Sequence, residues 1–178
     1  MSKIKVTFEN FTRLDRKSLE MIYKWRTSED IANCMDKHKA SFSLEEHLQF
    51  CESLKERKDK LYYLIKYDGH PCGVYDYVNI EQKQKKATFG VYLIKDFQKY
   101  ASVITFMQLF VCKKHSIVYA NFYVRKDNVK AVLFNAVKLK HKIVSEDDDY
   151  YYFEREYFEP TRSHLSSFLD KYEYEILD

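Results

Sequence analysis

Apolar and polar positions change their spacing several times along the chain, from a period of two to a period near 3.6 and back. Residues 3–8 alternate as a strand. Residues 16–26 have helical spacing behind an N-cap at Asp15, and a capping box at residues 43–46 opens a second helix that runs to about residue 57. Two helices are therefore predicted between the first strand and the second.

The rest of the chain continues as strands and helices. Asp68–Gly69 is a turn that joins the next two strands as a hairpin. The pattern predicts strands over residues 61–67, 72–80, 87–94, 116–124, 142–145 and 150–158, and helices over residues 96–114, 128–139 and 160–171. The order β-α-α-β-β-β-α-β-α-β-β, followed by a helix, predicts an α/β fold in which helices cover a mixed sheet.

Composition narrows the class of protein. The 178 residues are 46% hydrophobic and 32% charged, so we expect a single globular domain over residues 1–178. Lys and Arg number 30 against 27 Asp and Glu, which is too balanced to predict a nucleic-acid partner. No apolar run approaches the roughly 20 residues that span a bilayer, and the first residues lack a signal-peptide pattern. We therefore expect a cytoplasmic protein that does not insert into membranes.

Glycine and cysteine exclude several kinds of site. The three glycines, Gly69, Gly73 and Gly90, lie in one short stretch, so the glycine-rich phosphate loops of Rossmann and Walker type are excluded. The four cysteines are scattered without a C-x-x-C pair, which predicts buried free thiols rather than disulfides or a zinc site. No metal is expected.

Five segments follow one another in the order of a known family. They are residues 19–26 (LEMIYKWR), 43–50 (SLEEHLQF), 73–80 (GVYDYVNI), 89–92 (FGVY) and 123–131 (YVRKDNVKA). With the element order, they resemble the GNAT acyltransferase superfamily, and most closely the PseH-like nucleotide-sugar N-acetyltransferases of pseudaminic acid biosynthesis. The resemblance covers about residues 11–157. It implies a GNAT fold, a mostly antiparallel sheet of six or seven strands flanked by helices, here with an extra C-terminal helix.

The resemblance also implies a reaction. Acetyl-CoA would lie between the fourth and fifth strands, where backbone N–H groups near Phe89, Gly90, Val91 and Tyr92 stabilise the oxyanion formed when an amine attacks a thioester. The amine would belong to a nucleotide-linked amino-deoxy sugar, similar to UDP-4-amino-4,6-dideoxy-N-acetyl-altrosamine, and would attack directly. The expected acceptor-side residues are Arg26, Met35, His47, Tyr77 and Asn79.

Two segments depart from the family pattern. The pyrophosphate loop [RQ]-x-x-G-x-[GA] is represented by Gln98, Lys99, Tyr100, Ala101, Ser102 and Val103. A β-branched valine in place of the second small residue is expected to crowd a pyrophosphate. In the helix pattern N-x-x-A-x-x-[LF]-Y, the matching residues are Asn128, Ala131 and Phe134, but Asn135 replaces the tyrosine that would protonate the leaving thiolate.

The catalytic candidates are Asp76, Tyr123 and the position of Asn135. Asp76 lies in the middle of a strand and is a candidate base or acceptor ligand, with a solvated strand carboxylate as the alternative. Packing is the alternative for Tyr123. The run at residues 150–153 predicts a sheet edge that serves in a homodimer contact.

Two further functions stay open. The substitutions in the loop and at Asn135 suit a GNAT-fold protein that no longer acetylates and acts as a binding or scaffold partner. An acetyltransferase for another small-molecule or protein amine is the third alternative.

Overall fold

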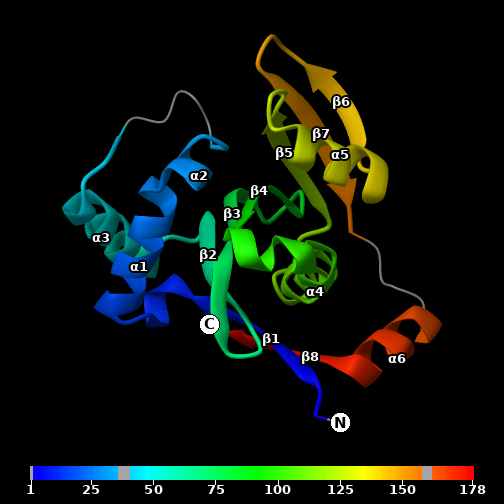
Figure 1. Ribbon diagram of the computed structural model, residues 1–178. Helices are drawn as coiled ribbons and strands as arrows, with labels where there is room; N and C mark the ends of the chain where they lie inside the picture. The colour runs from blue at the N-terminus through cyan, green and yellow to red at the C-terminus, as the bar shows by residue number, and fades with distance from the viewer. Residues whose placement is uncertain (1, 36–40, 158–161) are drawn as a thin grey trace.

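One eight-stranded sheet forms the centre of the molecule (Figure 1). The structure is a computed structural model that describes residues 2–35, 41–157 and 162–178. The strands are β1 (Ile4–Asn10), β2 (Lys60–Tyr67), β3 (His70–Glu81), β4 (Lys86–Leu93), β5 (Tyr119–Arg125), β6 (Lys142–Glu146), β7 (Tyr150–Glu156) and β8 (Tyr172–Leu177). The α-helices are α1 (Arg16–Thr27), α2 (Glu29–Ala32), α3 (Leu44–Ser53), α4 (Ala101–Lys114), α5 (Val129–Leu133) and α6 (Arg162–Lys171). The strand order is β6-β7-β5-β4-β3-β2-β1-β8.

The predicted mixed α/β arrangement is confirmed, and β8 extends it beyond the six or seven strands expected. β8 runs parallel to β1, with Ile4 opposite Tyr172. The segment YEYEIL alternates between apolar and charged residues from Tyr172 to Ile176, so the period-two signal was present after the last predicted helix. Pro160, expected to open that helix, lies outside the described residues.

Local capping places the first helices as the sequence predicts. The Asp15 side chain accepts a hydrogen bond from the Ser18 N–H at the start of α1. Ser43 and Glu46 form a reciprocal capping box at the start of α3. A side-chain cap of this kind contributes about 1 kcal/mol to helix stability.

Two predicted helices begin or end differently. The helix expected from residue 96 is a 3-10 helix over Lys95–Tyr100 and becomes α-helical at Ala101. The helix expected over residues 128–139 is split into the short α5 and a π-helical turn over Phe134–Lys138. Both breaks lie in segments where the sequence departs from the family pattern.

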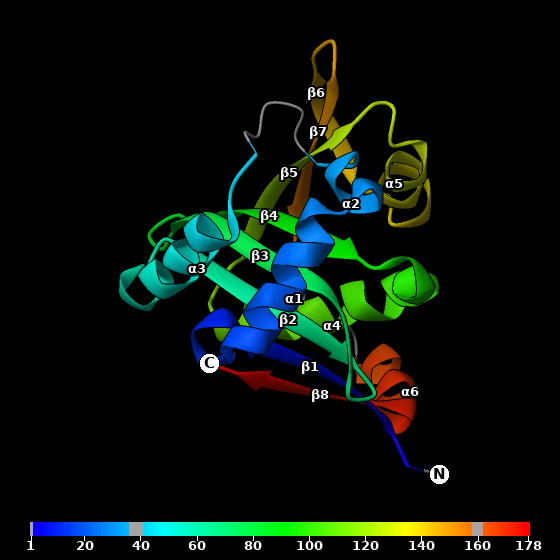
Figure 2. The ribbon, with the colours of Figure 1, turned by 60° about the vertical axis from the view of Figure 1, so that its left-hand side comes forward.

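Both faces of the sheet are packed, because successive side chains of a strand point to opposite faces and each face receives apolar residues. One face carries Phe8, Tyr63, Tyr75 and Phe89, which form the main core with α4. The other face forms a second core with α1 and α3, which lie together over β2 and β3 in Figure 2. The two faces therefore have different helical covers.

A hydrogen-bonded cluster holds the end of β8 against the sheet. The buried Tyr63 hydroxyl donates to Asp178 Oδ1 at 2.5 Å and accepts from His115 Nε2 at 2.7 Å. Lys114 Nζ lies 2.5 Å from Asp178 Oδ2. Burial alone would raise the pKa of Asp178, but the hydrogen bonds from Lys114 and Tyr63 outweigh it and lower that pKa.

Tyr63→Phe is expected to lower the free energy of unfolding by about 1–3 kcal/mol, because it leaves His115 and Asp178 without their shared partner. Urea denaturation at pH 7 measures the loss. Tyr174→Phe is the matched control, since Tyr174 is exposed and its ring stacks on Phe110. Equal unfolding midpoints for the two variants would show that the cluster contributes nothing.

Candidate functional site

The sheet opens between β4 and β5. These strands are parallel and pair only from Lys86 to Thr88 on β4 and from Tyr119 to Asn121 on β5. Beyond this point β4 keeps its pairing with β3 and β5 keeps its pairing with β7. Alternate backbone groups of β4 from Phe89 onward therefore face an opening instead of a strand. We call this opening the wedge.

Two aromatic rings close the narrow end of the wedge. Phe89 and Phe122 are the first residues beyond the last strand pair, and their ring centroids are 4.4 Å apart. Phe122 also stacks on Phe153 of the neighbouring strand. Two residues further along β4, Val91 is 44% exposed. The wedge is thus packed at its base and open along β4, with an apolar side chain at its surface.

The wide end of the wedge lies beside the N-terminus of α4. The 3-10 helix connects Leu93 to Ala101, and no side chain caps the first turn of α4. That turn has no acidic residue, while Lys99 lies just before it over the Tyr100 ring. The Ala101 N–H donates to the Gln98 carbonyl, and the positive end of the helix dipole in this turn favours an anion. The loop residues therefore fit a phosphate group.

Val103 lies at the loop where crowding of a pyrophosphate is predicted. Its side chain is half-buried and packs against the main core, and the crowding stays a prediction. Tyr100 stacks on Tyr67 at 4.2 Å, which fixes the loop against β2. Gln98 and Ser102 are the remaining polar residues of this loop.

Asp76 lies beside Gly90 on the face covered by α1 and α3. The two residues are opposite each other on β3 and β4, and Val74, two residues earlier, belongs to the second core. A Cβ at residue 90 would lie 2.8 Å from Asp76 Oδ2 and 3.1 Å from Oδ1. The absence of a Cβ at Gly90 therefore leaves room for the Asp76 carboxylate at the edge of the wedge.

Arg26, Tyr62 and Tyr92 surround this carboxylate. Burial raises the pKa of both tyrosines, and the Asp76 charge raises them further while Arg26 opposes the rise. The Tyr92 hydroxyl is buried without a hydrogen-bond partner among the described residues. A buried donor without a partner is costly, so this arrangement suits a polar ligand. Sequence reasoning missed Tyr62 altogether.

His47 and Tyr77 were expected to contact an acceptor, and the structure contradicts both. His47 is buried, and its Nε2–H donates to the Leu19 carbonyl, so it links α3 to α1. Tyr77 is fully buried on the opposite face, where its hydroxyl contacts Tyr75 and Cys112. Strand alternation explains the error, because Tyr77 and Asp76 are neighbours in sequence and point to opposite faces.

Met35 and Asn79 lie at the margins of the site. The Met35 carbonyl accepts a hydrogen bond from Arg125 at 3.3 Å, which ties the segment after α2 to the end of β5. Arg125 also forms an ion pair with Asp127. Asn79 is exposed in the left-handed region at φ 53°, three residues beyond Asp76. Arg125 was not predicted, and nothing in its local pattern distinguishes it.

A hollow of about 410 Å³ lies where β5 leads into α5. Asn128 lines it together with Cys34 and Lys130. Asn128 accepts a hydrogen bond from the Ala131 N–H and caps α5. Cys34 is exposed, which corrects the expectation that all four thiols are buried, whereas Cys51, Cys72 and Cys112 are buried as expected.

Asn135 is occupied by structural hydrogen bonds. Its amide donates to the Ala131 carbonyl at 2.9 Å, and its oxygen accepts from His141 Nδ1 at 3.1 Å. The π-helical turn begins at Phe134, immediately before it. The position that the resemblance assigns to a proton donor therefore holds a helix terminus together.

Tyr123 lies on β5 level with Gly90 across the wedge, since both are two residues beyond the last strand pair. Its ring meets Tyr150 edge-on at 5.3 Å. The run at residues 150–153 belongs to β7, which has β5 on one side and β6 on the other. The predicted sheet edge is therefore wrong, and with it the basis for a homodimer contact through this run.

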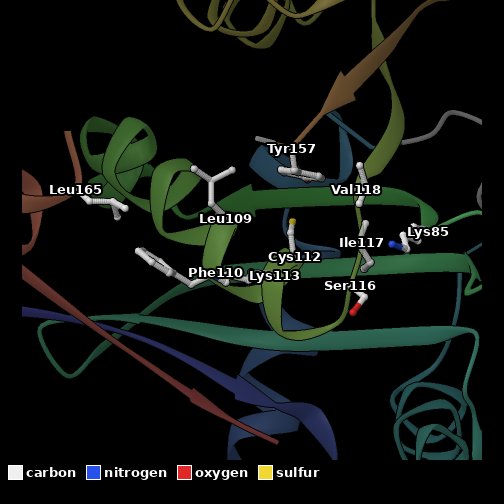
Figure 3. A pocket seen from close by; sticks show the side chains of 10 residues that line it. All are labelled: Lys85, Leu109, Phe110, Cys112, Lys113, Ser116, Ile117, Val118, Tyr157 and Leu165. Atoms are coloured by element: carbon white, nitrogen blue, oxygen red, sulfur yellow. The ribbon is translucent and has the colours of Figure 1, made fainter. Parts of the chain in front are cut away.

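A separate hollow of about 310 Å³ lies on the α4 side of the sheet (Figure 3). Cys112, Ile117, Tyr157 and Leu165 are among its lining residues. It lies next to α4 near the start of β5, away from the wedge.

Residues 2–35, 41–157 and 162–178 contain no group of three or more His, Cys, Asp or Glu side chains placed to hold a metal. In the same ranges every helix is too short or too polar to cross a bilayer.

The chain is similar to acetyltransferases of known sequence and structure. No protein-family model matches the chain. The chain is 33% identical over 155 residues to the acetyltransferase PseH of a Campylobacter jejuni strain. This match covers 83% of this chain and 91% of the relative. The crystal structure of Campylobacter jejuni N-acetyltransferase PseH in complex with acetyl coenzyme A superimposes with a TM-score of 0.66 at 28% identity, covering 85% of this chain and 98% of that one. Spermidine N-acetyltransferase from Vibrio cholerae has a TM-score of 0.72 at 13% identity, covering 92% and 98% of the two chains, and shows the fold alone.

The contact between Asn135 and His141 is expected to weaken in acid. Burial, and then the charge of Arg155, lower the pKa of His141 to about 4. Unfolded histidine titrates near ~6.5. The contribution is therefore complete above pH 6.5 and is lost as the pH falls toward 4, with a slope of up to about 1.4 kcal/mol per pH unit.

His141→Gln is expected to make the unfolding free energy less steep between pH 6.5 and 4, because this proton uptake is removed. Chemical denaturation at a series of pH values measures the slope. His70→Gln, at an exposed histidine, is the control, and His47 and His115, whose pKa burial also lowers, are present in both variants. An unchanged slope for His141→Gln would contradict the assignment.

Proposed function

This chain belongs to the PseH acetyltransferase family, and we propose that it transfers the acetyl group of acetyl-CoA to the amine of a nucleotide-linked amino-deoxy sugar. The expected GNAT fold is confirmed by the comparisons. The observation that carries the proposal is the wedge, with an uncapped α4 N-terminus at its wide end and Asp76 at its edge. The acceptor would resemble UDP-4-amino-4,6-dideoxy-N-acetyl-altrosamine, in pseudaminic acid biosynthesis. One domain and a cytoplasmic location belong to the same proposal.

Acetyl-CoA would bind along the wedge. The first-turn N–H groups of α4 at Ser102 and Val103, with Lys99 beside them, bind the pyrophosphate. Backbone groups of β4 between Phe89 and Tyr92 have no strand partner on the wedge side, so an N–H there is free to stabilise the thioester oxygen as it gains charge. The packed rings of Phe89 and Phe122 limit how deeply the acyl group enters.

The acceptor would bind on the face of the sheet that carries Asp76, the face covered by α1 and α3. The nitrogen lone pair of the neutral amine attacks the thioester carbonyl carbon, and the Asp76 carboxylate accepts the proton that the nitrogen loses. The Tyr92 hydroxyl and Arg26 orient polar groups of the sugar. The carbon–sulfur bond then breaks, and the CoA thiolate takes a proton from water. A thiolate with a solution pKa near ~8.5 leaves without a dedicated acid.

One observation favours a second candidate. The Asn135 side chain is held by Ala131 and His141, so the position of the family tyrosine offers no proton donor. A chain that had lost catalysis would tolerate this, and would serve as a binding or scaffold protein. Turnover with an amino-sugar acceptor separates the two candidates.

Titration of the protein with acetyl-CoA, followed by calorimetry, tests the first half of the reaction. We expect saturable binding in the micromolar range or tighter, equivalent to about 8 kcal/mol. Ser102→Asp is expected to weaken this binding at least about tenfold, because it places a negative charge where the pyrophosphate binds. The same aspartate favours the helix N-terminus, so stability is retained.

The control is Gln84→Asp in the exposed turn after β3, which adds the same charge away from the wedge. Absence of binding by the unmodified protein at millimolar acetyl-CoA would overturn the acetyltransferase proposal. Equal affinities for the two aspartate variants would remove the α4 N-terminus from the site.

Asp76→Asn is expected to lower kcat by about 100-fold or more at pH 7, since the general base is lost. The remaining rate should rise with pH as more of the amine becomes neutral, and the affinity for acetyl-CoA should not change. Gly90→Ala is expected to act in the same direction, because its Cβ displaces the Asp76 carboxylate. Steady-state kinetics across pH measure both effects. Glu81→Gln at the exposed end of β3 is the control, and a kcat for Asp76→Asn equal to that of this control would exclude Asp76 as the base.

A further inference from the structure

The row of residues that contains Asp76 and Gly90 continues across the wedge. Asp76 is opposite Gly90 in the β3–β4 pairing, and Tyr123 is level with Gly90 on the far side of the opening. On β7, Tyr152 is opposite Tyr123. Because Phe122 and Phe153 point into the main core, Tyr123 and Tyr152 point to the other face, the one that carries Asp76.

Three tyrosine rings gather at the far end of this row. Tyr123 meets Tyr150 at 5.3 Å and nearly perpendicular, and lies 6.2 Å from Tyr152. Tyr150 is buried, whereas Tyr123 is 42% exposed. The Tyr152 hydroxyl donates to Asp147 at 2.7 Å, which fixes the ring on β7. Buried and anchored neighbours thus hold an exposed aromatic ring in place.

We infer that Tyr123, supported by Tyr150 and Tyr152, is the stacking platform for the nucleobase of the nucleotide sugar. This inference rests on the proposed function. Neighbouring strands are about 4.8 Å apart, so the row from Asp76 to Tyr123 spans at least ~10 Å, and the opening of the wedge adds to it. An acceptor whose amine lies at Asp76 must extend its diphosphate and base away from the reacting end. Tyr123 lies on the same face of the sheet as Asp76, across the opening of the wedge from the expected position of the sugar.

The chemistry of the tyrosine cluster suits stacking on a nucleobase better than transfer of a proton. An aromatic side chain stacks on any base through its π face, without a specific hydrogen bond. Tyr123 was a catalytic candidate from sequence, but Asp76 and the β4 backbone already lie at the reacting position, on the other side of the wedge. Tyr123 is therefore a binding residue whose ring, not its hydroxyl, carries the effect.

The structure supplies a matched control in Tyr119. Tyr119 lies on the same strand and the same face, four residues earlier, and is 40% exposed. It is separated from Tyr123 by roughly 13 Å along the strand. Replacing either tyrosine removes an exposed ring from β5, but only one of them lies level with Gly90.

Calorimetric titration with uridine diphosphate tests the platform without requiring turnover. Tyr123→Ala and Tyr123→Leu are expected to weaken binding at least about fivefold, and Tyr123→Phe to stay within about twofold of the unmodified protein. Tyr119→Ala should not change the affinity. In steady-state kinetics, Tyr123→Ala should raise KM for the nucleotide sugar and leave the affinity for acetyl-CoA as it is.

Each other outcome overturns the inference. Loss of affinity in Tyr123→Phe as large as in Tyr123→Ala would assign the effect to the hydroxyl. Equal affinities for Tyr123→Ala, Tyr123→Leu and Tyr119→Ala, or absence of uridine diphosphate binding by the unmodified protein, would show that no base stacks there. Dissociation of a dimer by Tyr123→Ala in sedimentation would show that a second copy covers the rings. Failure of the proposed function is separate, because it appears as absence of acetyl-CoA binding or transfer by the unmodified protein.

Discussion

Parallel pairing between β4 and β5 lasts for three residues, and the rest of the structure is arranged around the place where it stops. Up to Thr88 the backbone groups of the two strands satisfy each other. Beyond it, the rings of Phe89 and Phe122 fill the space between the strands on one face, and β5 is held by its seven-residue pairing with β7. The opening therefore has a packed base, a backbone lining and two different faces. The α4 N-terminus lies at its wide end because a short 3-10 helix turns the chain back directly after β4.

The elements of this arrangement that depend on local sequence were predictable, and those that depend on register were not. Capping at Asp15 and Ser43, the hairpin turn and Asp76 follow from neighbouring residues. The strand partner of Asp76 does not follow from neighbouring residues. Regular pairing counted from the hairpin turn would place residue 75 opposite Tyr62. In the structure Asp76 is opposite Tyr62, because a bulge at Cys72 shifts the register by one. Pro71 lacks the N–H that regular pairing would use, so the irregularity has a physical cause beside it.

Burial in the structure distinguishes tyrosines that look equivalent in the sequence. Tyr75 and Tyr77 join Gln108 and Tyr157 in a buried hydrogen-bonded network under α4, so their hydroxyl groups are satisfied within the core. Tyr123, with the same chemistry, stays exposed. With 16 tyrosines in the chain, only the alternation of strands relative to their helical covers distinguishes a core tyrosine from one at a site. The π-helical turn at Phe134 is equally invisible to periodicity, because it depends on a specific hydrogen bond between Asn135 and His141.

The parallel pairing of β1 with β8 has a consequence for how the chain folds. Ile4 and its partner Tyr172 are 168 positions apart in the sequence. Until β8 reaches the sheet, β1 has a partner only on its β2 side, and an unpaired strand edge is a template for association with other chains. Contacts between residues so far apart in sequence also slow folding, since the whole loop must close before they form. The eighth strand thus completes the sheet through a pairing between distant parts of the sequence, on the edge remote from the wedge.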